Sequence, residues 1–125
     1  MSCGVEYMWR QTVLSYQKLD VYQCAIKFLA LVAEILGKLP RGYAFLADEL
    51  KRAAMSIPQN IAEGVGKPTE ADRSRYLGIA RGSAMECGAI LDACTVLSLA
   101  NAETLGKGRD LLERIVSMLT KMMGI

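Results

Sequence analysis

Apolar residues recur at steps of three and four along four segments of this chain, the spacing that gathers side chains on one face of an α-helix. Short runs rich in glycine, proline or polar residues separate the segments. We therefore expect helices over about residues 20–39, 44–64, 70–100 and 103–123. Connections this short place consecutive helices side by side, so the pattern predicts an all-α, antiparallel up-down-up-down four-helix bundle.

Polar residues mark two of the expected helix starts. Asp20 precedes the first apolar residue of its segment and is a good N-cap. Thr69 precedes the third segment, and Asp72 follows three residues later, which makes an acidic variant of the capping box. These residues predict that the first helix is capped by Asp20 and the third by Thr69.

Three glycines, Gly78, Gly82 and Gly88, lie inside the third predicted helix. Each costs about 1 kcal/mol relative to alanine at a helix interior. A close backbone approach is the usual compensation, so we expect a neighbouring helix to pack tightly at these positions.

The second predicted helix has a proline at its centre, Pro58, although proline inside a helix costs about 3 kcal/mol. If polar stripes on this helix and the next face each other, they form a network that locks helix register. The same side chains also suit a ligand or partner contact, or an acid–base pair, so three alternatives stay open. The stripes consist of Arg52, Ser56, Asn60 and Glu63 on the second helix and of Ser83 and Glu86 on the third.

Composition argues against chemistry at such a site. Of 125 residues, 52% are hydrophobic and 6% aromatic, which suits one helical domain packed through small side chains. The chain has no histidine, the commonest general base and metal ligand, and carries no cofactor motif. Glu63 and Glu86 alone make a poor transition-metal site. We therefore expect no enzymatic activity, no cofactor and no metal.

The cysteines and the hydropathy profile bear on the compartment. Cys3, Cys24, Cys87 and Cys94 include no CxxC pair, so we expect buried thiols in a reducing environment. The sequence shows no signal peptide, and no apolar run approaches the ~18 residues of a membrane span. These features predict a cytoplasmic protein without a membrane partner.

Basic residues gather in two stretches, interleaved with carboxylates. The net charge of +2 and the isoelectric point near 8.4 are too mild to predict nucleic-acid binding by themselves. The clusters are either solvated faces or a rim that contacts phosphates. Under the second interpretation, the candidate RNA-binding residues are Lys67, Arg73, Arg75 and Arg81, together with Lys107 and Arg109.

Four motifs occur in order: LDVY at 19–22, RAA at 52–54, SIPQNIAEG at 56–64 and ARGSAME at 80–86. Together they resemble the four-helix bundle proteins encoded in intervening sequences of bacterial 23S ribosomal RNA genes, over about residues 19–123. This resemblance implies an up-down four-helix bundle that assembles into a homopentameric ring. The family is also similar in fold to a basic, pentameric retroelement accessory subunit that binds reverse transcriptase and RNA.

The resemblance sets the expected organisation of the chain. Residues 1–18 lie outside it and form a lead-in arm or short helix, and residues 19–125 form the bundle domain. Trp9, the only tryptophan, suits a hydrophobic plug. The residues at 87–89, Cys-Gly-Ala, are smaller or less polar than is usual in the family, so we expect local packing to differ there.

Two functions fit these features. The first is a non-enzymatic, oligomeric scaffold that associates with RNA or a ribonucleoprotein through the basic residues. The second is a protein–protein interaction adaptor without a nucleic-acid role, whose partner docks on exposed apolar surface or through Trp9. Excess apolar surface on two of the helices also predicts self-association.

Overall fold

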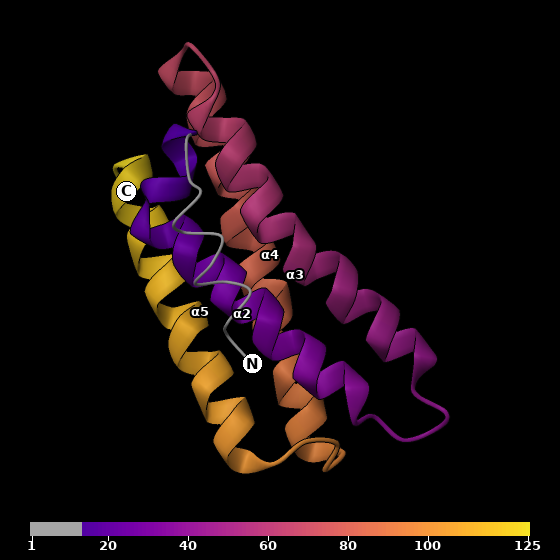
Figure 1. The fold of residues 1–125 in the computed structure, drawn as a ribbon. Coiled ribbons are helices and arrows are strands. Elements are labelled where there is room, and N and C mark those ends of the chain that lie inside the picture. Colours follow the sequence, from indigo (N-terminus) through magenta and orange to yellow (C-terminus); the bar gives the residue numbers. More distant parts are fainter. Residues whose placement is uncertain (1–13) are drawn as a thin grey trace.

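A computed structural model describes residues 14–125, which form four long α-helices preceded by one short 3-10 helix (Figure 1). These residues contain no β-strand, so the all-α prediction is confirmed. Cys3, Trp9 and most of the expected lead-in arm lie outside the described residues. The elements are η1 (Ser15–Lys18), α2 (Asp20–Gly37), α3 (Ala44–Val65), α4 (Glu70–Val96) and α5 (Ala102–Met123).

The four helices lie side by side around one core. Each packs against its neighbours in the chain, α2 also packs against α5, and the most extensive contact joins α3 to α4. In Figure 1 the α3–α4 connection lies at the upper end of the molecule, whereas the α2–α3 and α4–α5 connections lie at the lower end. Within residues 14–125, no helix combines the length and the hydropathy needed to cross a membrane.

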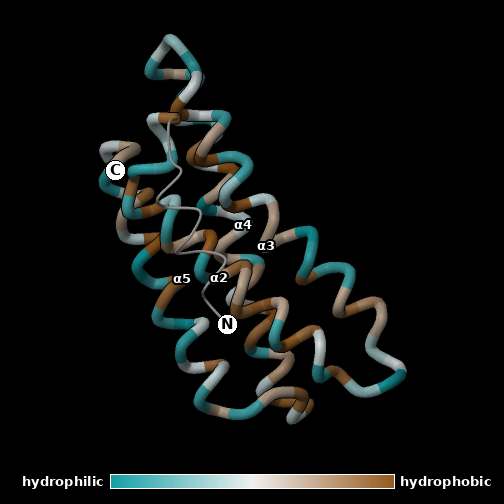
Figure 2. The backbone as a smooth tube through the Cα atoms, in the orientation of Figure 1, coloured by the Kyte–Doolittle hydropathy of each residue, from teal (hydrophilic) through white to brown (hydrophobic). Residues whose placement is uncertain are grey.

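Every helix contributes apolar side chains to the core. Figure 2 shows hydrophobic and hydrophilic stretches alternating along each helix, as the three- and four-residue spacing predicts. Burial of such side chains contributes about 1.5–3 kcal/mol each, so the core supplies the main favourable term in folding. The largest fully buried side chains include Phe28, Ile35, Leu50, Ile57, Ile61, Leu77, Leu91, Leu105, Ile115 and Leu119.

The helix starts agree with the sequence at Thr69 and differ at Asp20. The Thr69 hydroxyl accepts a hydrogen bond from the Asp72 backbone N–H at 3.2 Å, which confirms the predicted cap of α4. Asp20, by contrast, is the first helical residue of α2. The N-cap is Leu19, without a side-chain bond, because η1 ends directly before it and leads the chain into the helix.

The third predicted helix ends earlier than expected, at Val96 rather than near residue 100. Ser98 has a φ of 56°, in the left-handed region that ends a right-handed helix. The Leu99 backbone N–H then donates to the carbonyl of Cys94 at 2.9 Å. This turn brings the Leu99 side chain back into the core, where it is buried. Tertiary burial of one leucine therefore overrides the continued helical pattern.

Within residues 14–125, no helix backbone makes the expected close approach at the α4 glycines. A Cβ added at Gly82 or Gly88 would meet nothing within 4 Å, and one at Gly78 would meet only the flexible end of Met123. The close approaches instead occur at Gly64 in α3 and Gly108 in α5. These two positions lie on buried helix faces, whereas Gly82 is exposed on the outer face of α4.

Gly64 is the point where the end of α3 meets the start of α4. A Cβ there would lie 3.1 Å from the Arg73 carbonyl oxygen and 3.2 Å from the Tyr76 Cβ. Both are rigid parts of α4, so a side chain at position 64 would force the two helices apart. Pro58 lies six residues earlier and is buried, and α3 stays helical through it.

We predict opposite effects for two glycine substitutions. Gly64→Ala should lower the free energy of unfolding by about 1–3 kcal/mol, because the new methyl group collides with the α4 backbone. Gly106→Ala should raise it by up to about 1 kcal/mol, since its Cβ meets nothing and alanine favours the helix. Urea unfolding measures both. Equal effects of the two substitutions would contradict the assigned contact.

Candidate functional site

A hydrogen-bonded network joins α3 to α4 along the predicted polar stripes. The buried Ser83 hydroxyl donates to Ser56 Oγ at 2.8 Å. The Asn60 side-chain amide donates to Ser56 Oγ at 3.0 Å and to the Ser56 carbonyl at 2.8 Å. Ser56 is therefore the centre of the network, and each of its partners fixes it against the neighbouring helix or turn.

The charged members of the stripes lie farther out. Arg52 forms a hydrogen-bonded ion pair with Glu86 across the α3–α4 contact. Their side chains are 62% and 39% exposed, so this pair contributes little to stability. Glu63 does not join the network, because its carboxylate lies 3.0 Å from the Lys67 ammonium, one helical turn further on. Residues 14–125 contain no group of three or more potential metal-ligating side chains.

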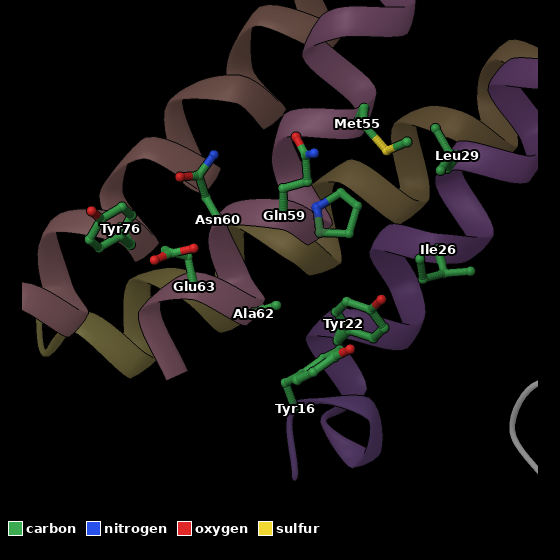
Figure 3. A pocket seen from close by; sticks show the side chains of 11 residues that line it. Tyr16, Tyr22, Ile26, Leu29, Met55, Gln59, Asn60, Ala62, Glu63 and Tyr76 are labelled. Carbon is green, nitrogen blue, oxygen red and sulfur yellow. The ribbon is translucent and has the colours of Figure 1, made fainter. Parts of the chain in front are cut away.

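An open cavity of about 940 Å³ lies between α3 and the segment formed by η1 and α2 (Figure 3). The Tyr16 and Tyr22 rings form one wall and meet edge to face at 4.8 Å. Burial, and secondarily the neighbouring Tyr16, raises the pKa of Tyr22 above its usual 10.0. Met55 and Gln59 of α3 line the opposite side. The cavity therefore offers both apolar contacts and hydrogen-bonding groups.

Nothing in the spacing of Tyr16 and Tyr22 predicts their pairing, because residues six apart do not share a helix face. The pairing arises because η1 folds the chain back before α2 begins. Tyr76, which lines the far end of the same cavity, was also not predicted as a site residue. Only its position next to Arg75 gives a signal, since adjacent aromatic and basic residues often interact.

A second hollow, of about 760 Å³, lies between α4 and α5. Its lining is mainly apolar and includes Met85, Gly88, Ala89, Leu112 and Val116. The charged residues around it, Asp92, Arg109, Asp110 and Glu113, are mostly acidic. We call this surface the α4–α5 groove. Gly88 and Ala89 belong to the segment whose packing was expected to differ, and their small size keeps the groove open.

The described cysteines are free and buried, as predicted: Cys24, Cys87 and Cys94. Burial raises the pKa of Cys87 to about 12, and the nearby Glu86 carboxylate adds to this shift. Burial also raises the pKa of Cys94. Because the thiolate is the reactive form, both side chains are poor nucleophiles at neutral pH.

Three of the predicted basic residues converge where α3 turns into α4, and we call them the basic corner: Lys67, Arg73 and Arg75. The Lys67 ammonium lies 5.1 Å from the centre of the Tyr76 ring, and the Arg75 guanidinium lies 4.7 Å from it. Arg75 also donates to the Tyr76 hydroxyl at 3.1 Å. Arg73 donates to the Lys67 carbonyl oxygen at 3.4 Å, which ties the connection to α4.

The surroundings of Lys67 favour its protonated, positively charged form. Its hydrogen bond to Glu63 raises the pKa of the ammonium, and the electrostatic attraction of Glu63 and of Tyr76 adds to the shift. Arg73 and Arg75 form no ion pair within residues 14–125. The basic corner therefore carries three positive charges, with one ion-paired carboxylate, Glu63, and a second carboxylate, Asp72, near enough to raise the pKa of Lys67 slightly further.

The other predicted basic residues lie elsewhere. Arg81 donates to the Thr120 hydroxyl at 2.9 Å, Lys107 lies 3.8 Å from Glu103, and Arg109 pairs with Asp92 at 3.3 Å. Arg109 also donates to Thr95 at 2.6 Å. Arg73 and Asp92 are 19 residues apart on α4, about 28 Å along the helix. The six residues therefore form separate groups rather than one patch.

Comparison with protein families matches residues 17–121 to the family described as 23S rRNA-intervening sequence protein. No curated protein matches the chain. One similar solved structure is that of a protein of unknown function from the S23 ribosomal protein family of Bacteroides thetaiotaomicron. It superposes with a TM-score of 0.77 at 19% identity, over 84% of this chain and 99% of that one. At this identity the likeness shows the fold alone.

We predict that the network depends on Ser56 and not on Glu63. Ser56→Ala should lower the free energy of unfolding by about 1–3 kcal/mol, because the buried Ser83 hydroxyl loses its acceptor. Glu63→Ala should change it by less than about 0.5 kcal/mol, since this carboxylate is exposed. Thermal and urea unfolding measure both. A larger loss for Glu63→Ala would contradict this assignment.

Proposed function

The chain belongs to the 23S rRNA-intervening sequence protein family, and from this premise we propose that it is a non-enzymatic scaffold associated with RNA or a ribonucleoprotein. Neither the family description nor that of the similar structure names a catalytic activity. The buried thiols suit a reducing compartment, so we place the protein in the cytoplasm.

The basic corner is the feature of the molecule that most favours RNA binding. Lys67, Arg73 and Arg75 come from one connection and the first turns of one helix, and Lys67 alone forms an ion pair within residues 14–125, with Glu63. Phosphates are the ligands that such clustered, mostly unpaired cations bind through charge-assisted hydrogen bonds. Lys107 and Arg109 already pair with carboxylates, and Arg81 with Thr120, so these three serve as weaker outer contacts.

The proposed scaffold is an antiparallel up-down-up-down bundle assembled into a homopentameric ring. The short connections and their alternating ends in Figure 1 support the bundle. Exposed apolar surface on α4 supports the assembly, since Met85 is 52% exposed and lines the α4–α5 groove. The open space beside Gly82 and Gly88 leaves room for a helix of a second copy.

Assembly would strengthen a modest RNA contact. A ring presents the same basic corner once per subunit, so several weak phosphate contacts act on one RNA at high effective concentration. A net charge of only +2 per chain is then no obstacle to binding, because local charge and repetition decide the affinity.

We predict that the basic corner dominates RNA binding. A Lys67→Ala/Arg73→Ala/Arg75→Ala variant should bind ribosomal RNA fragments about 10–100-fold more weakly at 50 mM salt, with a salt slope reduced by about 2 per site. Lys107→Ala/Arg109→Ala, the matched variant, should lose only about two- to fivefold, because its cations are paired. Titrations at 50 and 200 mM salt measure both.

Unchanged RNA binding by the triple variant would contradict the assignment of the basic corner as the RNA-binding surface. Absence of binding by the wild-type protein at low salt would remove the RNA role altogether. That second outcome would favour the adaptor function, in which the α4–α5 groove receives a protein partner.

We predict that a charge in the α4–α5 groove prevents assembly. Ala89→Glu places a carboxylate among the apolar lining residues, where contact with another subunit would bury it unpaired. Light scattering should then report a mass near 13.7 kDa, that of one chain. Ala102→Glu, on an exposed residue at the start of α5, should leave the wild-type mass unchanged. The same mass for Ala89→Glu as for wild type would contradict the proposed contact face.

A further inference from the structure

We propose that Tyr76 is the positioning residue of the basic corner: its ring holds the Lys67 ammonium and the Arg75 guanidinium together for contact with RNA phosphates. This inference rests on the proposed RNA-binding function and assigns the chemistry of that same site. Under this proposal the basic corner binds RNA phosphates, and no base stacks on the Tyr76 ring.

The geometry starts from the two cations. Both lie close to one ring, Lys67 at 5.1 Å and Arg75 at 4.7 Å from its centre, so they are within about 10 Å of each other. Like charges at that separation repel, and long flexible side chains would otherwise move apart. The electron-rich π system of the ring attracts both cations, and the Tyr76 hydroxyl additionally accepts a hydrogen bond from Arg75.

The ring itself is held by the backbone. Tyr76 Cβ lies against Gly64, where an added Cβ would be only 3.2 Å away. The missing side chain at position 64 therefore lets α4 approach α3 until Tyr76 faces the end of that helix. Lys67 follows Gly64 by three residues, and its ammonium is tethered to Glu63 at 3.0 Å. Figure 3 shows Tyr76 close to Glu63 and away from Tyr16 and Tyr22.

This arrangement distinguishes positioning from base stacking. Single-stranded RNA commonly stacks its bases on exposed aromatic faces. The Tyr76 ring is only partly exposed, and two cations already lie against it. A base would have to displace one of them, with loss of a phosphate contact. Recognition at the corner is therefore expected to depend on phosphates and to ignore base identity.

A double-mutant cycle tests the coupling, with single-stranded oligouridylate as the probe at 50 mM salt. In the wild-type background, Lys67→Ala should weaken binding about three- to tenfold. In a Tyr76→Leu background, which has already lost the ring, the same change should cost less than about twofold. Tyr76→Phe keeps the ring and should bind within about twofold of wild type. Lys38→Ala is the matched control and should cost the same in both backgrounds. Lys38 is the C-cap of α2, and the α2–α3 connection lies at the opposite end of the molecule from the α3–α4 connection in Figure 1.

Coupling between positions 67 and 76, with a melting temperature for Tyr76→Leu close to that of wild type, supports the inference. Tyr76→Met replaces Tyr76→Leu if the leucine variant does not fold. If the losses in affinity for Lys67→Ala and Tyr76→Leu are additive, the positioning role is overturned. If they are additive and Tyr76→Phe still binds like wild type, Tyr76 stacks on a base instead. Absence of binding by the wild-type protein overturns the proposed function together with this inference, whereas additivity in a protein that binds overturns this inference alone.

Discussion

The close contact between Gly64 and the start of α4 determines how near α3 and α4 can approach each other. With no side chain at this position, the last turn of α3 comes within van der Waals distance of the Arg73 carbonyl and the Tyr76 Cβ. The α3–α4 contact, the most extensive in the bundle, includes this position. Farther along the two helices, the Ser56–Ser83 hydrogen bond fixes their register. The same contact sets Tyr76 beside Lys67 and so creates the basic corner.

The sequence predicted the architecture well because helix signals are local. Spacing of apolar residues located four helices, and Thr69 with Asp72 marked the start of α4. The end of α4 was placed too late, because the turn at Ser98 depends on burying Leu99 in a core formed by other helices. The spacing of apolar residues within one helix does not reveal that tertiary contact.

The candidate site was predicted less completely, for the same physical reason. The stripes on α3 and α4 do meet, but Glu63 turns to Lys67, a partner that the i,i+4 spacing also permits. Glycine composition alone did not reveal which glycine faces a neighbouring helix, so Gly64 and Gly108 were missed in favour of Gly78, Gly82 and Gly88, which have no close backbone neighbour within residues 14–125. Basic residues that cluster in sequence separated in space, since α4 carries Arg73 and Arg81 to different neighbours.

Two surfaces of the bundle have different proposed roles: the basic corner binds RNA, and the α4–α5 groove contacts another subunit. The basic corner combines charge with rigid placement, whereas the α4–α5 groove is apolar and has a mostly acidic surround. Hydrogen–deuterium exchange with and without oligoribonucleotide tests this division most directly. We expect slower exchange in residues 64–76 at 50 mM salt and loss of that protection at 200 mM salt. Protection confined to the α4–α5 groove, or none anywhere, would contradict it.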